Sequence, residues 1–149
     1  MAISGIVLGV VGTALTVLVV VLIIHATSYG SIGRLQAGAC FDNTQPGQVS
    51  TQVHFLSSCA QPHNGQVVGT FVLSGGAWPG SQAVRGQASA GCAAMLSSVL
   101  RERGLASGVS GLIYTPDQQA WASGSRTASC VLLDRYARHA GSLFTGSTP

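Results

Sequence analysis

The sequence predicts an α+β domain that follows a single N-terminal transmembrane helix. Residues 49–56 and 66–73 are rich in Val, Thr and Phe with strand-like spacing, whereas apolar residues within 81–103 recur at three- and four-residue steps. The segment Ile3–Ile24 contains no charged residue. Strands that precede and follow one long helix indicate a small, mostly antiparallel sheet covered on one face by that helix.

The uncharged segment Ile3–Ile24 is 22 residues long. A helix of this length reaches about 33 Å, enough to cross a hydrocarbon core of roughly 30 Å. A cleaved signal peptide is the alternative, but no Lys or Arg precedes the segment, which also exceeds the usual apolar core of about 7–15 residues. A lipobox-like sequence precedes Cys40, yet His25–Leu35 separates it from the apolar segment. We therefore expect an uncleaved single-pass anchor over residues 1–26.

Three glycines, Gly5, Gly9 and Gly12, fall close to one face of this predicted helix. A small-xxx-small pattern lets a second transmembrane helix approach closely, which assigns these glycines to helix packing. The alternative is a lipid-facing helix in which the glycines are incidental.

Four cysteines, Cys40, Cys59, Cys92 and Cys130, all follow the anchor. An even number in a small domain indicates two disulfides and an oxidising compartment. Zinc ligation is the alternative, but no pair has the C-x-x-C spacing of compact zinc sites. We expect the domain outside the cytoplasm and the N-terminus inside. Four cysteines allow three pairings; we predict Cys40–Cys59, at the start of the domain, and Cys92–Cys130, between the helix and the last strand.

The elements of the domain follow in order. Residues 27–38 are rich in Gly and Ser and predict a flexible linker, and residues 39–134 form the domain. Its first two predicted strands are expected to be antiparallel neighbours, with a tight turn at Asn64-Gly65.

The long predicted helix over 81–103 has Ser81 as its N-cap and Gly104 as its stop signal. The rest of the domain is predicted to contain a strand, a short helical turn and a last strand, at Val109–Tyr114, Thr115–Trp121 and Arg126–Leu133. Thr115 is the expected N-cap of the short turn. Residues 135–149 have weak patterning and are assigned to a C-terminal tail. One or two last helical turns within Asp134–Phe144 are one alternative, and the end of the tail is expected to be loose.

Composition and motifs exclude several functions. Charged residues are only 7% of the chain, against roughly 25% in soluble proteins, and the net charge is +3. All seven basic residues are Arg and none cluster, so no nucleic-acid partner is expected. The sequence contains no G-x-S-x-G, no P-loop and no G-x-G-x-x-G. We therefore expect no catalytic residues and no cofactor.

His63 is the strongest candidate for chemistry. A cell-wall enzyme built on His63 with Asp42 or Asp117 is one alternative, and a metal or small-ligand sensor is another. We favour a structural histidine that donates a hydrogen bond to a backbone carbonyl, and we expect no bound metal.

Two tryptophans, Trp78 and Trp121, are expected to be core anchors, with a ligand platform as the alternative. Arg126 lies in an apolar strand, where an unpaired charge would be costly. We expect it to extend its charge to solvent or to pair with Asp117 or Asp42.

A fixed succession of short motifs runs through the domain: Gly38-Ala39-Cys40-Phe41-Asp42, Cys59-Ala60-Gln61-Pro62-His63-Asn64-Gly65-Gln66-Val67, Trp78-Pro79-Gly80, Ala90-Gly91-Cys92, and Trp121 to Cys130. From about Leu35 to Leu133, this succession resembles the septum-formation domain family of actinobacterial membrane-anchored proteins. The resemblance assigns family-motif positions to Pro62, His63, Trp78, Pro79, Trp121, Gly124 and Arg126.

The chain departs from the family pattern at four positions that are usually acidic, where it has Ala39, Asn64, Gln66 and Ser125. If the family's acids hold a metal with His63, this chain is not expected to do so. The resemblance implies the fold, the extracytoplasmic location and a link to cell division.

We therefore expect a non-catalytic binding or scaffold protein, an accessory subunit of an envelope assembly. The expected partners are the membrane and other membrane or envelope proteins. A subunit of another large membrane complex, such as a respiratory supercomplex, is the alternative. The sequence does not indicate whether the domain binds a small molecule.

Overall fold

A computed structural model describes residues 2–27, 29–43, 50–103 and 108–143; the side chains of 2–8, 25–27, 102 and 103 also lie outside the description. The elements in chain order are α1 (Ala2–Thr27), β1 (Tyr29–Ser31), the 3-10 helix η1 (Ile32–Arg34), β2 (Cys40–Asp42), β3 (Gln52–Phe55), β4 (Gly65–Val72), α2 (Ser81–Arg103), β5 (Val109–Tyr114), α3 (Gln118–Ala122) and β6 (Thr127–Asp134).

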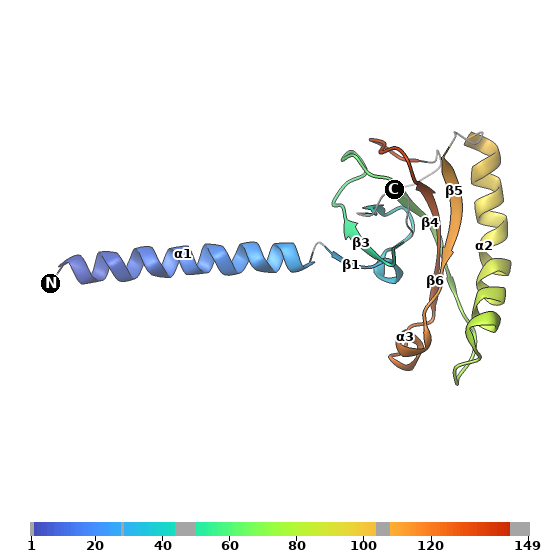
Figure 1. The fold of residues 1–149 in the computed structure, drawn as a ribbon, viewed down its shortest axis with the longest axis horizontal. Helices are drawn as coiled ribbons and strands as arrows, with labels where there is room; N and C mark the ends of the chain where they lie inside the picture. The colour runs from blue at the N-terminus through green and yellow to red at the C-terminus, as the bar shows by residue number, and fades with distance from the viewer. Residues whose placement is uncertain (1, 28, 44–49, 104–107, 144–149) are drawn as a thin grey trace.

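The described strands form one antiparallel sheet in the order β1-β3-β2-β4-β6-β5. Figure 1 shows α2 lying along the β4-β6-β5 part of the sheet, while the β1-β3-β2 part curls away from α2. The strand β6 lies between these layers, so its residues from Ala128 to Asp134 are all buried. The predicted α+β fold, with one long helix on a mostly antiparallel sheet, is confirmed.

Alternating side chains of β6 enter two apolar layers. Val131 and Leu133 enter a cluster on the curled side of the sheet, with Ile32, Phe41, Val53, Val67 and Tyr114. Cys130 and Leu132 enter a cluster beneath α2, with Cys92, Leu96 and Leu143. A third cluster contains Leu73, Val84, Ala88, Trp121 and Ala128. Two disulfides are present: Cys40–Cys59 joins β2 to the segment between β3 and β4, and Cys92–Cys130 joins α2 to β6.

The long helix α2 buries the stripe that its sequence predicts. Val84, Ala88, Cys92 and Leu96 recur every four residues and are all buried. Ser81 is the first residue of the helix, and the carbonyl of Gly80 accepts the first-turn bond from the Val84 N–H at 3.1 Å. The N-cap predicted at Ser81 is therefore one residue too late. The stop signal predicted at Gly104 lies outside the described residues.

Two local predictions, one about strand pairing and one about a helix cap, are wrong. The strands β3 and β4 are not neighbours, because the three-residue strand β2 lies between them and pairs with both. The N-cap of α3 is Asp117 rather than Thr115, since the Asp117 carboxylate accepts a hydrogen bond from the Ala120 N–H at 2.7 Å.

The segment predicted as a flexible linker is partly folded. The strand β1 pairs with β3, and η1 follows it directly. Ile32 is buried in the curled-side cluster, and its N–H donates to the carbonyl of Thr51 at 3.0 Å. The linker prediction is therefore wrong for these residues, because one buried isoleucine and a three-residue strand fix them to the sheet.

Residues 135–143 form what we call the C-terminal strap. They contain no helix, yet they fold back over the sheet, where Leu143 is buried in the cluster beneath α2. Within 135–143, both the last helical turns and a loose tail are therefore wrong, whereas the end at 144–149 lies outside the description.

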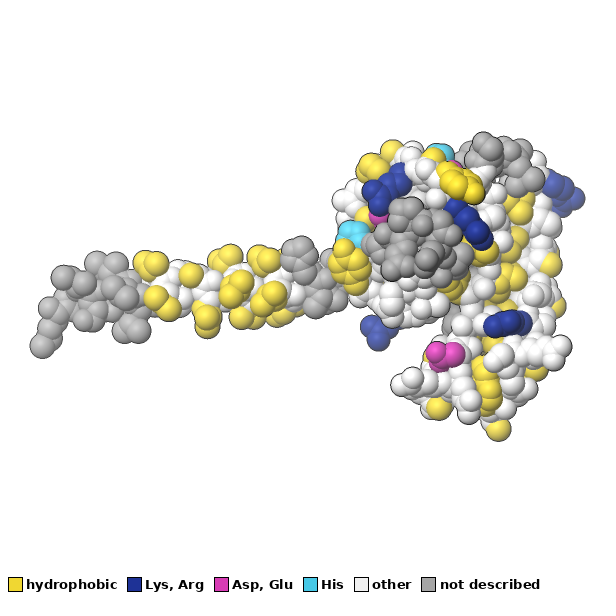
Figure 2. All heavy atoms as spheres, in the orientation of Figure 1, with side chains coloured by type: hydrophobic (Ala, Val, Ile, Leu, Met, Phe, Trp, Pro, Cys, Tyr) yellow, Lys and Arg dark blue, Asp and Glu magenta, His cyan; other side chains and the backbone are white. Residues whose placement is uncertain are grey.

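The helix α1 extends away from the domain (Figure 1). Its residues from Gly9 to Ile24 are all exposed, and Figure 2 shows apolar side chains along the visible face of this part of the helix. A methyl group added at Gly9 or Gly12 would meet no other atom within 4 Å. Searched over the described residues, the structure offers no helix whose length and apolar character suffice for crossing a bilayer.

Candidate functional site

Backbone hydrogen bonds hold the C-terminal strap against the loop that carries His63. We call residues 59–66 the His63 loop. The N–H of His63 donates to the carbonyl of His139 at 3.0 Å, and the N–H of His139 donates to the carbonyl of His63 at 2.7 Å. The N–H of Gly141 donates to the carbonyl of Cys59 at 2.6 Å. The strap thus adds an antiparallel bridge beside the loop and covers it.

Gln66 and Asn64, two neutral residues within the family motif, form buried hydrogen bonds to distant segments of the chain. The Gln66 Oε1 atom accepts from the hydroxyl of Ser142 at 3.2 Å and from the N–H of Leu143, while its Nε2 donates to the carbonyl of Gly38 at 3.3 Å. An amide both donates and accepts, whereas an ionised carboxylate only accepts. The Gln66 side chain therefore uses the donor that a glutamate at this position would lack.

Asn64 also uses both its acceptor and its donor, in this case on Asn43. Its Oδ1 accepts from the Asn43 N–H at 2.8 Å, and its Nδ2 donates to the Asn43 carbonyl at 3.3 Å. Both residues are buried. Asn64 and Gln66, which replace acidic residues of the family pattern, thus have structural roles that were not predicted from the sequence.

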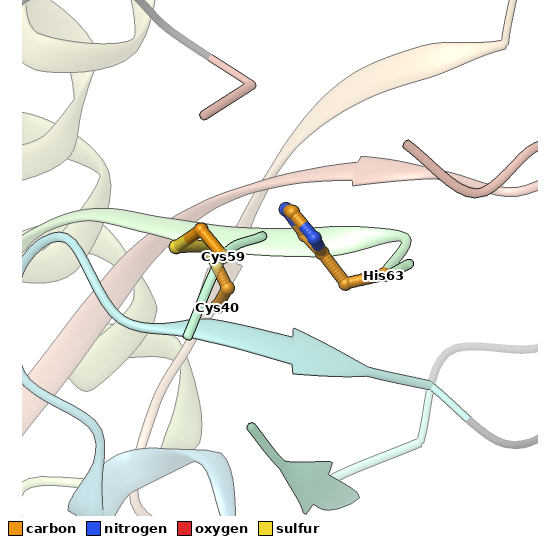
Figure 3. A group of neighbouring side chains, drawn as sticks. All are labelled: Cys40, Cys59 and His63. Carbon is orange, nitrogen blue, oxygen red and sulfur yellow. A yellow bond between two sulfur atoms is a disulfide. The ribbon is translucent and has the colours of Figure 1, made fainter. Parts of the chain in front are cut away.

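His63 is fully buried beside the Cys40–Cys59 disulfide (Figure 3). Its Nδ1 lies 2.8 Å from the carbonyl of Gln61, which only accepts, so Nδ1 carries the proton. This hydrogen bond is the one that the sequence analysis expected. The Nε2 atom has no hydrogen-bond partner among the described residues. A buried polar atom left in this state costs about 1–3 kcal/mol, so it calls for an explanation.

The His63 ring and the neighbouring disulfide form a compact group of donor atoms. A ring nitrogen of His63 and the sulfur atoms of Cys40 and Cys59 lie within 4.8 Å of one another. While the sulfurs are bonded to each other they are not thiolates, which are the form that binds metal. The oxidised site therefore offers only one strong metal ligand, the imidazole.

The buried carboxylates near the loop are engaged by the strap. Arg138 donates to both oxygens of Asp42, at 3.0 and 2.6 Å. His139 Nε2 lies 2.7 Å from the Asp134 carboxylate. Burial by itself raises the pKa of Asp134, but hydrogen bonds from His139 and from the N–H groups of Tyr136 and Ala137 outweigh it and lower that pKa below its usual value.

The carboxylates considered as catalytic partners of His63 are used elsewhere. Asp42 pairs with Arg138, and Asp117 caps α3. Within the described part of the chain, neither carboxylate has a hydrogen bond to His63. The hydroxyl of Tyr114 donates to a backbone carbonyl, and burial, partly offset by the charge of Arg135, raises the pKa of Tyr114 to about 12. A proton acceptor with this pKa is poorly suited to catalysis near neutral pH.

The second half of the family motif forms a clamp around Trp121. The guanidinium of Arg126 stacks 3.9 Å above the Trp121 ring and donates to the carbonyls of Trp121, Ser125 and Gly76. Trp78 contacts Trp121 edge-to-face, with ring centroids 5.5 Å apart. The alternative that Arg126 pairs with Asp117 or Asp42 is wrong, because carbonyls and an aromatic face satisfy its charge. The residue is only partly buried, which agrees with the other alternative, that its charge extends toward solvent.

The remaining motif positions lie at turns around these two groups. Pro62 is exposed next to His63, and Pro79 is exposed just before α2. Gly124 follows α3 with φ of +91°, a conformation that favours glycine. The structure thus divides the motif between the His63 loop and the Trp121 clamp.

These features define a small, disulfide-stabilised α+β domain whose buried polar residues mainly connect its own segments. The chain carries this domain behind a long apolar helix.

The chain belongs to the septum-formation family, whose family model matches residues 28–134. This match confirms the resemblance indicated by the motifs, and it includes β1 and η1 but ends before the C-terminal strap. Neither a curated protein nor a solved structure matches the chain.

Proposed function

We propose that the protein is a membrane-anchored, non-catalytic binding subunit of an envelope assembly that serves septum formation. The observation that carries this proposal is the pairing of a disulfide-stabilised domain with the uncharged segment Ile3–Ile24. That segment has the length of a membrane span, and the side chains described within it, from Gly9 onward, have no protein cover.

The disulfides support an extracytoplasmic domain. Such bonds form and persist in oxidising compartments and are rare in the cytoplasm. Both bonds lie after the apolar segment, so the proposed orientation places the N-terminus inside and the domain outside.

The use of the polar motif residues supports binding rather than catalysis. Asp42, Asn64 and Gln66 are bonded to other parts of the same chain, and Arg126 is held in the Trp121 clamp. A general base must lie within hydrogen-bond distance of the proton that it removes, and His63 is completely buried, which keeps its ring away from a substrate in solution.

The strap offers a surface for a protein partner. Tyr136 is 85% exposed, and it lines a hollow of about 290 Å³ together with Arg135, Arg138, Asn43 and Asn64. Tyrosine and arginine are, with tryptophan, the residue types enriched in the energetic centres of protein interfaces.

Cell fractionation, protease protection and crosslinking test this proposal. We expect the chain in the membrane fraction, with its domain digested only by protease added to the outer side. A photo-crosslinking residue at Tyr136 is expected to capture a stoichiometric envelope protein, whereas the matched control at Ser89, exposed on α2, is not. A chain released by salt washing, or one that runs alone in mild detergent, would contradict the proposal.

Glycine replacements distinguish an anchor from a packing helix. If Gly5, Gly9 and Gly12 dock on a partner helix, Leu at these positions is expected to abolish association while the chain stays in the membrane. Association unchanged by Leu would assign the helix to anchoring alone. Co-purification with a respiratory complex instead of division proteins would favour the alternative assembly.

A further inference from the structure

We propose that reduction of the Cys40–Cys59 disulfide creates a binding site for a zinc-like divalent cation, with both thiolates and Nε2 of His63 as ligands. The three side chains already offer donor atoms within 4.8 Å of one another. Borderline-soft cations such as Zn²⁺ bind cysteine thiolates together with imidazole.

His63 is already held in the form that a metal ligand requires. Its Nδ1 proton is donated to the Gln61 carbonyl at 2.8 Å, so the lone pair of the neutral ring lies on Nε2. Ligating histidines typically donate their other N–H to a carbonyl or carboxylate in this way. Nε2 is buried and has no hydrogen-bond partner among the described residues, so a cation there would satisfy an atom that the oxidised fold leaves unpaired.

The two disulfides differ in their exposure to solvent and in the potential metal ligands beside them. Cys59 is partly exposed, whereas Cys92 and Cys130 are completely buried. Thiol–disulfide exchange requires a reductant to reach a sulfur, so the Cys40–Cys59 bond is expected to open first. In the described part of the chain, the Cys92–Cys130 pair belongs to no group of three potential metal ligands, which makes it an internal control.

The chemical steps balance as follows. A dithiol reductant transfers two electrons and two protons to the S–S bond of Cys40–Cys59 and becomes a disulfide itself. The cation then displaces the two thiol protons, which pass to solvent, and a water molecule completes four-fold coordination. With Zn–S bonds of about 2.3 Å, the sulfurs would move to roughly 3.8 Å apart. Reversal by oxidation would release the cation.

Metal titration of the full chain in mild detergent tests the proposal. The chain is reduced anaerobically with a phosphine, and Co²⁺ is added as a probe before competition with Zn²⁺. We expect one equivalent of Co²⁺ with thiolate charge-transfer and tetrahedral ligand-field absorption, displaced by Zn²⁺. The oxidised chain is expected to bind none, in line with the expectation from the sequence that the protein carries no metal.

Paired variants assign the ligands. The Cys92→Ala/Cys130→Ala variant is expected to keep the cobalt spectrum, whereas the Cys40→Ser/Cys59→Ser variant is expected to lose it. His63→Gln is expected to weaken binding by about 10-fold or more. Because this buried substitution risks unfolding the domain, X-ray absorption of the zinc-loaded wild-type chain provides a second measurement, with two sulfurs and an imidazole nitrogen expected.

Three results would overturn the proposal. They are a reduced wild-type chain that binds no Co²⁺ or Zn²⁺, undiminished binding by folded His63→Gln or by Cys40→Ser/Cys59→Ser, and a zinc coordination shell without imidazole.

Discussion

Replacing Gly65 by alanine is expected to destabilise the domain, because the new methyl group would overlap the ring of Phe41. Gly65 lies opposite Phe41 in the β2–β4 pairing, and Phe41 is completely buried, so the ring has no free space into which it could move. Overpacking of this kind costs about 1–3 kcal/mol, whereas the reduced freedom of the unfolded chain returns about 0.4–1 kcal/mol. We therefore expect the free energy of unfolding to fall by about 1–2 kcal/mol.

Gly86 is the matched control, since it lies on the exposed face of α2 and no other atom would lie within 4 Å of an added methyl group. Gly86→Ala is expected to raise the free energy of unfolding by about 0.5–1 kcal/mol through helix propensity. Urea unfolding of the full chain in detergent, followed by the fluorescence of buried Trp121, measures both changes. If Gly65→Ala is neutral or stabilising, the packing argument at Phe41 is wrong.

Three further predictions concern a disulfide, a carboxylate and the Trp121 clamp. Cys92→Ala/Cys130→Ala removes a disulfide that closes a loop of 38 residues and is expected to lower the free energy of unfolding by about 4 kcal/mol. Loss of Cys40–Cys59, which closes a loop of 19 residues, is expected to lower it by about 3 kcal/mol, and the reverse order in urea unfolding would refute the loop-entropy argument. Because the folded-state pKa of Asp134 is lowered, its ionised form stabilises the fold above the unfolded pKa of about 3.9, and this contribution is lost as pH falls through the folded pKa. Asp134→Asn is therefore expected to flatten the acid limb of the stability curve, whereas an unchanged limb would assign it to other groups. Arg126→Lys is expected to cost about 1–2 kcal/mol, since lysine cannot stack on Trp121 while donating to three carbonyls; wild-type stability in the same assay would contradict this.

Long periodic elements were predictable from the sequence. The apolar residues from Val84 to Leu96 recur every four positions over more than three helical turns, and all four are buried. A pattern of this length and period indicates a helix rather than a short strand. The strand β5 and the greater part of β6 were also located, and an even number of cysteines correctly indicated two disulfides.

Short elements and distant contacts were not predictable in the same way. The strands β1 and β2 have three residues each, too few to display a period of two. Because β2 was not predicted, β3 and β4 were expected to pair directly with each other. The C-terminal strap is held by bonds to residues far away in the chain, such as Arg138 to Asp42, which local patterns do not encode.

At the candidate site, the hydrogen bond from His63 to a backbone carbonyl was predicted, but its unpaired Nε2 was not. The roles of Asn64 and Gln66 were missed as well. Their signal was present in the sequence, because amides that replace acids within a motif gain a donor. The partners of Arg126 within the protein were misjudged because only aspartates were considered for that role, whereas the fold supplies carbonyls and an aromatic ring.

The short connection between α1 and the sheet limits how far the domain can move from the end of the helix. The helix α1 ends at Thr27, and β1 begins at Tyr29. A flexible tether of twelve residues would allow excursions of roughly 20 Å, whereas a single residue reaches at most about 3.6 Å. If α1 is the proposed anchor, the domain stays next to the bilayer surface. A ligand or subunit that binds the domain must then lie within the first molecular layer of the envelope.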